Sequence, residues 1–158
     1  MKKIILFLTL MTLLFPQKDN LVSDVESVLD DLHRYASEAN SKKYIDLFAS
    51  SAVFFGTDMS ERWHINEFNE YATKRMATGT GWTYKMKERN IYFSDDKRTA
   101  WFDEVLINKN YGNFRGTGAL KIENNKWKIV QYNLLLPIPN DLLKKYASEI
   151  KEYYKSQW

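Results

Sequence analysis

The stretch from Thr99 to Pro137 limits the possible folds most, because it reads as long strands separated by short connections. The predicted strands cover residues 99–107, 114–123 and 127–136. Each is about ten residues long, whereas a usual strand has roughly five or six. Long strands joined by short turns form a twisted antiparallel meander, and the curvature of such a sheet leaves one concave face. Helices from elsewhere in the chain are expected to cover that face.

The residues before this stretch predict the covering helices. Apolar residues at helical spacing predict a helix that is capped by Asn20 or Ser23 and runs to about Ala39. A short helix at residues 42–48, a short buried strand at 52–56 and a helix at 65–76 are predicted to follow, and residues 82–94 begin to alternate as a further strand. Helices followed by a run of strands indicate an α+β fold, with a curved antiparallel sheet and the helices on its concave face.

The two ends of the chain differ from the middle. Met1-Lys2-Lys3 and the apolar run to Phe15 predict that residues 1–17 are a secretory signal peptide, and hence that the protein is exported, as a periplasmic or secreted protein. An uncleaved N-terminal anchor is the alternative, because residues 14–17 lack the small side chains of a cleavage site; without it no stable membrane span is expected. Residues 20–139 are the predicted domain, and 140–158 are predicted to form a helical extension.

Composition excludes several classes of function. The chain has 23 basic and 20 acidic residues, two of the basic ones within the predicted signal, so no binding to nucleic acid is expected. It has no cysteine, which excludes disulfides, thiolate metal sites and cysteine catalysis. The two histidines, His33 and His64, lie at no metal-ligand spacing, so no metal site is predicted, and neither is a cofactor.

Four short motifs carry a resemblance to a known family. They are Phe55-Gly-Thr-Asp58 with Trp63 after it, Ala100-Trp-Phe-Asp-Glu104, Arg115-Gly-Thr-Gly118 and Trp127-Lys-Ile-Val-Gln-Tyr-Asn133. Together they resemble the SnoaL-like branch of the nuclear-transport-factor-2-like superfamily, over roughly residues 21–139. The resemblance implies a cone-shaped fold with an internal cavity. This fold hosts isomerases, dehydratases, cyclases and non-catalytic adaptors, so the resemblance indicates the fold more than an activity.

Asp103 and Tyr35 are the candidate catalytic residues. Asp103 alternates with Trp101 and Val105 on one face of a strand, and if that face is concave, burial would raise the pKa of this acid and make it a general acid or base. The alternative is a structural ion pair with Arg115 on the next strand. Tyr35 lies in the apolar stripe of the first helix, where its hydroxyl would reach the cavity or only fill the core.

The candidate ligand-binding residues are expected around the same cavity. Trp101 and Arg115 belong to the strands just described, and a two-residue turn at Asn124-Asn125 would place Thr117 opposite Tyr132. Tyr132 is therefore the preferred inward residue of the last strand, with Gln131 and Asn133 as the alternative if a bulge shifts the pairing. Asp58 and Trp63 are expected at the cavity mouth, where helix capping and local packing explain them equally well.

Three functions are compatible with these features. The first is an exported small-molecule-binding protein with an aromatic-lined pocket for a hydrophobic or aromatic ligand. The second is a cofactor-independent lyase or isomerase of the SnoaL type that works by acid–base catalysis. The third is a non-catalytic module that dimerises or binds a partner. A homodimer formed through the exposed face of the sheet is expected in any of the three, because helices cover only one face.

Overall fold

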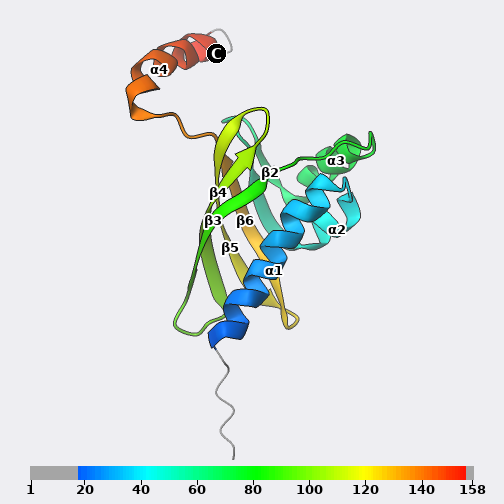
Figure 1. The fold of residues 1–158 in the computed structure, drawn as a ribbon. Helices are drawn as coiled ribbons and strands as arrows, with labels where there is room; N and C mark the ends of the chain where they lie inside the picture. Colours follow the sequence, from blue (N-terminus) through cyan, green and yellow to red (C-terminus); the bar gives the residue numbers. More distant parts are fainter. Residues whose placement is uncertain (1–17, 156–158) are drawn as a thin grey trace, which may run out of the picture.

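The computed structural model describes residues 18–155, and the predicted signal peptide at 1–17 lies outside the described residues. Helices and strands follow the predicted order, with one additional short strand before the third helix (Figure 1). The elements are α1 (Lys18–Ser37), α2 (Ser41–Asp46), β1 (Phe48–Phe55), β2 (Arg62–His64), α3 (Ile65–Met76), β3 (Lys85–Phe93), β4 (Thr99–Asn108), β5 (Gly112–Glu123), β6 (Lys126–Leu135) and α4 (Asn140–Lys155).

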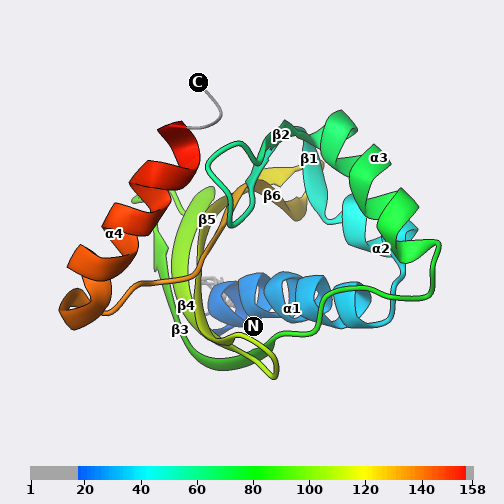
Figure 2. The same cartoon turned by 90° about the horizontal axis from the view of Figure 1, so that it is seen from above.

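The six strands form one curved sheet in the order β2-β1-β6-β5-β4-β3. Seen from above, the sheet bends around α1, and α2 and α3 lie beside α1 on the same concave side (Figure 2). The predicted α+β fold with helices on the concave face is confirmed. The sheet is not wholly antiparallel, however, because β1 pairs with β6 in parallel, a pairing that the sequence analysis did not predict.

The turn between β5 and β6 has the predicted two residues, but the strands do not keep the register that this turn sets. Asn124 and Asn125 both have positive φ, 48° and 60°, as the favoured two-residue hairpin turn requires. The pairing then shifts by one residue, because Val130 is an extra residue in β6, and Thr117 faces Asn133 instead of Tyr132. The bulge lies within the strand and not in the turn, and after it Tyr132 and Leu134 are buried.

A second bulge reorients β3. The pairing with β4 shifts between Met86 and Glu88, so Lys87 is the extra residue there. A single inserted residue exchanges the two faces of a strand, because side chains alternate with a period of two. After this bulge Arg89, which pairs with Glu104 on β4, points toward the helices.

The inward face of β4 is opposite to the one considered in the sequence analysis. Phe102, Glu104 and Leu106 are buried in the core, against the apolar side of α1, whereas Trp101 is 46% exposed. The hypothesis that Trp101 and Asp103 face the concave side is therefore wrong. Both faces of β4 carry apolar residues and one acid, and burial selects the face with Phe102 and Leu106 because those side chains complete the core.

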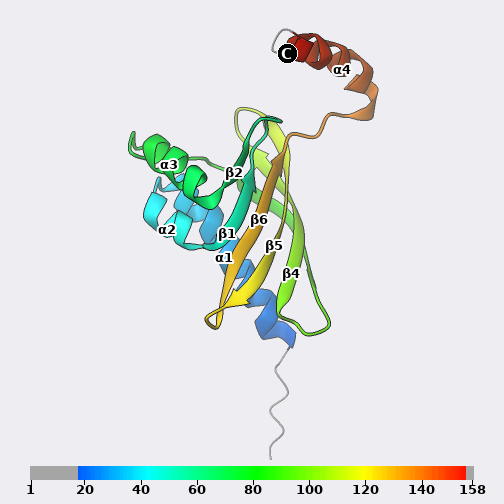
Figure 3. The same cartoon turned by 180° about the vertical axis from the view of Figure 1, so that it is seen from behind.

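The C-terminal helix is present, but it adds nothing to the core. Figures 1 and 3 show α4 beyond the end of the sheet, joined to β6 by an extended segment at residues 136–139. None of its residues is buried, and its apolar side, which includes Leu143, Ile150 and Tyr153, is exposed. No helix within residues 18–155 is long and apolar enough to cross a membrane. The domain boundary at residue 140 stays a prediction.

Candidate functional site

The concave side of the sheet holds a cavity of about 150 Å³. Leu32, His33 and Ala36 of α1 form one wall, and Phe54, Tyr132 and Leu134 of the sheet form the opposite one. A cavity of this size in a protein core holds a molecule with roughly the dimensions of benzene. The site therefore suits a small molecule or one ring-sized part of a larger one.

Stacked aromatic rings form most of the cavity wall. The ring of Phe54 stacks on that of Phe68 from α3, with 3.9 Å between the ring centroids. It also stacks on the ring of Tyr132, with 5.4 Å between the centroids. Trp63 and Tyr71 stack on each other at 5.0 Å. Rings packed in this way lose little further freedom when a ligand binds, so the cavity is largely preformed.

The segment after α3 brings Trp82 and Tyr84 to the same cavity. This segment passes close to the end of α1, where the Trp82 backbone N–H donates a hydrogen bond to the Ala36 carbonyl at 3.2 Å. A Cβ atom on Gly81 would lie 1.7 Å from that carbonyl oxygen, so only glycine permits the approach. Gly81 thus fixes the position of the Trp82 ring over the cavity.

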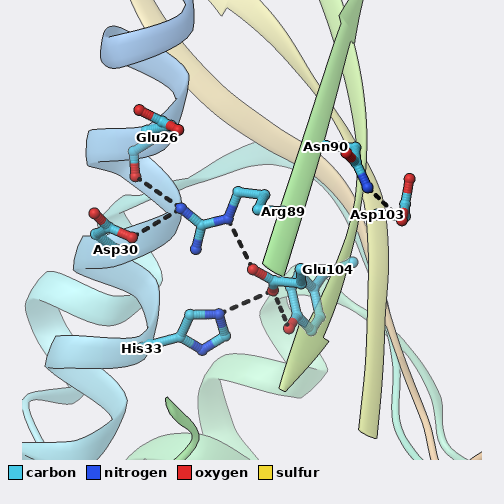
Figure 4. Close-up of polar contacts among 8 residues, drawn as sticks. Glu26, Asp30, His33, Arg89, Asn90, Asp103 and Glu104 are labelled. Atoms are coloured by element: carbon cyan, nitrogen blue, oxygen red, sulfur yellow. Dashed lines mark hydrogen bonds and ion pairs between the residues drawn. The ribbon is translucent and has the colours of Figure 1, made fainter. Parts of the chain in front are cut away.

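The most unusual residue beside the cavity is Glu104, whose side chain is fully buried. Its Oε1 atom accepts hydrogen bonds from His33 Nε2 at 2.9 Å and from the Tyr132 hydroxyl at 3.0 Å. Its Oε2 atom accepts a hydrogen bond from Arg89 Nε at 2.9 Å. Figure 4 shows Arg89, Glu104 and His33 between α1 and the sheet. The carboxylate therefore joins the first helix to strands β3, β4 and β6.

These contacts keep Glu104 ionised. Burial raises the pKa of the Glu104 carboxyl, but the hydrogen bond from His33 and the charge and hydrogen bond of Arg89 lower it by more, so the pKa lies below its usual value. An ionised carboxylate only accepts hydrogen bonds, so His33 Nε2 must carry a proton toward Glu104. In the neutral imidazole, Nδ1 is then the acceptor, and His33 reaches the cavity wall with 11% of its side-chain surface exposed.

Neighbouring residues make room for this carboxylate and balance its charge. A Cβ atom on Gly116 would lie 2.7 Å from both Glu104 Oε1 and the Tyr132 hydroxyl oxygen, so a glycine on β5 is needed beside them. Arg89, only 2% exposed, also binds Asp30 of α1 through Nη1 at 2.8 Å. Its Nη2 atom is the one fully buried side-chain polar atom within residues 18–155 that has no hydrogen-bond partner in the structure.

Two of the residues predicted to bind a ligand line the cavity. Trp63 on β2 forms part of the aromatic wall, and Tyr132 on β6 lies between Phe54 and Glu104. Burial and the negative charge of Glu104 raise the pKa of the Tyr132 hydroxyl well above its usual value, so it stays protonated. Their contact with a ligand stays a prediction.

Four of the predicted site residues come together on the outer face of the sheet instead. Asp103 lies opposite Thr117, which lies opposite Asn133, and Trp101 and Arg115 are exposed on the same side. Figure 4 shows Asp103 bonded to Asn90 on the far side of the strands from Glu104, with 3.3 Å between Asn90 Nδ2 and Asp103 Oδ1. The alternative, an ion pair of Asp103 with Arg115, is not among the salt bridges of residues 18–155, and Arg115 lies opposite Val105.

The other two predicted residues lie outside the cavity wall. Tyr35 is half-buried on α1, with the Arg34 guanidinium over its ring at 4.2 Å and the Lys43 ammonium at 5.4 Å. Asp58 is exposed in the turn between β1 and β2, where its Oδ1 accepts hydrogen bonds from the Ser60 hydroxyl at 2.6 Å and the Ser60 N–H at 2.8 Å. These bonds lower the pKa of Asp58 and hold the turn, whereas the residue that caps α3 is His64 and not Asp58.

Metal binding has no structural basis in the described part of the chain. Across residues 18–155, no three His, Cys, Asp or Glu side chains are grouped so that they could hold a metal ion. The polar groups on the cavity wall include the imidazole of His33, the phenol groups of its tyrosines and the carboxylate of Glu61.

The sequence of residues 25–139 matches the family model described as a SnoaL-like domain. The chain belongs to the SnoaL-like family. No curated protein matches its sequence. The family match covers α2, α3, every strand and most of α1, and it ends before α4.

Solved structures share the fold of this SnoaL-like protein at low sequence identity. One is a proposed dehydratase of the nuclear-transport-factor-2-like family from Streptomyces avermitilis, with a TM-score of 0.67 and 11% identity over 78% of this chain and 100% of that one. A proposed scytalone dehydratase from Novosphingobium aromaticivorans has a TM-score of 0.62 and 13% identity over 75% of this chain and 87% of that one. A proposed aromatic ring hydroxylase from the same organism has a TM-score of 0.65 and 13% identity over 78% of this chain and 93% of that one.

Sequence reasoning missed the three residues at the centre of the SnoaL-like site. Glu104 interrupts an alternation of Ala100, Phe102 and Leu106, and an acid at such a position is a sequence signal for a buried carboxylate. His33 directly follows Leu32 at the edge of the apolar stripe, where a boundary position is all that the spacing indicates. Nothing in the sequence indicates that Arg89 is buried, because only the bulge at Lys87 turns its side chain inward.

The buried network predicts that the neighbouring acids Asp103 and Glu104 contribute very differently to the free energy of unfolding. Replacing Glu104 with Gln would leave Arg89 buried beside a neutral group, and we expect a loss of on the order of 3 kcal/mol in the free energy of unfolding. Asp103→Asn is the matched control on the outer face, where we expect a loss of less than about 1 kcal/mol. Urea unfolding of both variants measures the two values, and equal small losses would contradict the network.

The pH dependence of this difference has a defined direction. Because the pKa of Glu104 is lowered in the folded protein, its stabilising contribution is complete above the pKa of the unfolded chain, about 4.3, and is lost as the pH falls through the folded value. The stability gap between wild type and Glu104→Gln should therefore be largest near neutral pH and shrink in acid.

Proposed function

We propose that this SnoaL-like protein is a cofactor-independent lyase or isomerase that transfers a proton on a small molecule bound in the cavity. The observation that carries the proposal is the contact of His33 with the ionised Glu104 at the cavity wall. A carboxylate that holds one nitrogen of an imidazole leaves the other available as a general base. No histidine lies in strands β3 to β6, but α1 supplies His33.

The chemistry follows from the protonation states of the site. His33 Nδ1 takes a proton from a substrate carbon, and the electron pair released forms a double bond while a leaving group departs or a neighbouring carbonyl becomes an enolate. The imidazolium that results is stabilised by the Glu104 carboxylate 2.9 Å from Nε2. The Tyr44 hydroxyl lines the same cavity, and burial raises its pKa, so it stays protonated and can donate to a substrate oxygen.

The structural neighbours support the same class of reaction. Two of the structures similar in fold are described as proposed dehydratases, and dehydration begins with removal of a proton from carbon. A role in binding without catalysis would use the same cavity and the same aromatic wall. The two functions differ only in whether His33 transfers a proton, so a test on His33 separates them.

The proposal predicts that His33→Asn abolishes turnover. Small β-hydroxy ketones and enones serve as trial substrates, and their turnover is monitored by ultraviolet absorbance. His64→Asn is the matched control, since His64 is exposed at the start of α3 and asparagine also caps helices well. Equal rates for the two variants, or binding of a trial ligand without any turnover, would refute proton transfer by His33.

We also propose that two copies associate through the outer face of the sheet. Tyr92 and Trp101 stack there with 6.0 Å between ring centroids, and 47% and 46% of their respective surfaces are exposed. Exposed neighbouring aromatic rings favour a symmetric contact between copies.

Light scattering tests this contact. At roughly tens of micromolar protein, the wild type is expected to have the mass of a dimer and Trp101→Asp that of a monomer. Tyr111→Asp, at an exposed residue of the β4–β5 turn, is the control and should keep the dimer. A monomeric wild type at this concentration would contradict the proposal.

Export of the protein is a further proposal, supported by the charged and apolar layout of residues 1–15. Fractionation of the native host should recover the protein outside the cytoplasm, as a periplasmic or secreted species. Recovery from the cytosol with Met1 still present would show that the segment does not act as a signal.

A further inference from the structure

The lining of the cavity has a marked electrostatic bias. Aromatic rings make up much of it, no lysine or arginine is part of it, and Glu61 is the carboxylate that lines it directly. The π faces of tryptophan and tyrosine rings carry partial negative charge and attract cations. The lining offers an anion no lysine or arginine, because Arg89 binds Glu104 and Asp30 and is not part of the lining.

Glu61 is held in place at the cavity but is not neutralised. Its Oε2 atom accepts a hydrogen bond from the Asp58 backbone N–H at 3.2 Å. A Cβ atom on Gly56 would lie 2.1 Å from the same oxygen, so the glycine leaves space for the carboxylate. No ion pair involving Glu61 occurs among the salt bridges of residues 18–155. Its half-buried charge therefore remains available to a ligand.

Two aromatic residues with strong π faces lie around this carboxylate. Trp82 and Tyr84 line the cavity with Glu61. Burial raises the pKa of the Tyr84 hydroxyl, the charge of Arg75 lowers it, and Tyr111 and the charge of Glu61 raise it by smaller amounts. The Trp82 ring already attracts one cation, since the Arg75 guanidinium lies 5.2 Å from its centroid without being part of the lining.

We propose that the cavity takes a small organic cation, an amine or quaternary ammonium compound, whose positive group lies between Glu61 and the rings of Trp82 and Tyr84. A trimethylammonium group is close in size to the benzene-sized space available. This names the substrate class of the site and rests on the proposed function only for the reaction at His33.

The test compares ligands of equal shape and different charge. Choline and its uncharged isostere 3,3-dimethylbutan-1-ol, together with benzyltrimethylammonium, are titrated into the full-length protein by calorimetry and by the fluorescence of its tryptophans. We expect both cations to bind. Choline should bind about tenfold more tightly than its isostere, because a desolvated cation–π contact and a carboxylate stabilise only the charged ligand. Equal affinities for the isosteres, or no binding of either cation, would overturn the proposal.

Variants locate the interaction within the cavity. Glu61→Gln keeps an acceptor for the Asp58 N–H but removes the charge, so cation affinity should fall about tenfold and that of the alcohol should not change. Trp82→Leu keeps an apolar wall and should have the same selective effect. Glu70→Gln, at an exposed position of α3, is the charge control and should bind choline as the wild type does. If Glu70→Gln lowers the affinity as much as Glu61→Gln does, the cation is not bound at this cavity.

His33→Asn separates this inference from the proposed function. If it loses turnover but still prefers choline over the alcohol, both proposals stand. If the wild type has no turnover with any amine but still binds choline more tightly than the alcohol, the proposed cation site stands and proton transfer by His33 is refuted. Turnover of neutral substrates that depends on His33, with no preference for cations, would leave the proposed function and overturn the cation site.

Discussion

The carboxylate of Glu104, buried between α1 and the sheet, is the constraint on which the rest of the structure depends. An ionised group without water around it is tolerated only when donors surround it, and here Arg89, His33 and Tyr132 supply them. Each donor comes from a different element, α1, β3 or β6, and these must all meet the same carboxylate on β4. The network thereby fixes how the helix sits in the curve of the sheet.

The same network connects stability with chemistry. His33 and Tyr132 both bind Glu104 Oε1, and both also line the cavity, so the groups that satisfy the buried charge form part of the binding site. Glycines at positions 81 and 116 permit the close approaches that this requires. His33, Glu104 and Tyr132 all lie on packed helices and strands, which suits a reaction that depends on the placement of one imidazole.

Much of the fold could be predicted from the sequence. Long alternating strands predicted the meander from β3 to β6, helical spacing predicted α1, α3 and α4, and the motifs around Trp63 and Trp127 indicated the SnoaL-like family that the family match shows. The candidate site was predicted less well. Trp63 and Tyr132 line the cavity, whereas Asp103, Trp101, Arg115 and Asn133 lie on the outer face.

The sequence by itself determined the helices and all the strands except the short β2, because propensity and periodicity act over a few neighbouring residues. It also determined the aromatic composition from which the cavity is built. Only the tertiary structure decided which face of each strand points inward. Single extra residues at Lys87 and Val130 reverse that direction in β3 and β6, and β4 offers an acid on either face. The choice between Asp103 and Glu104 depends on distant donors such as His33, whose positions are set only when the whole sheet packs against α1.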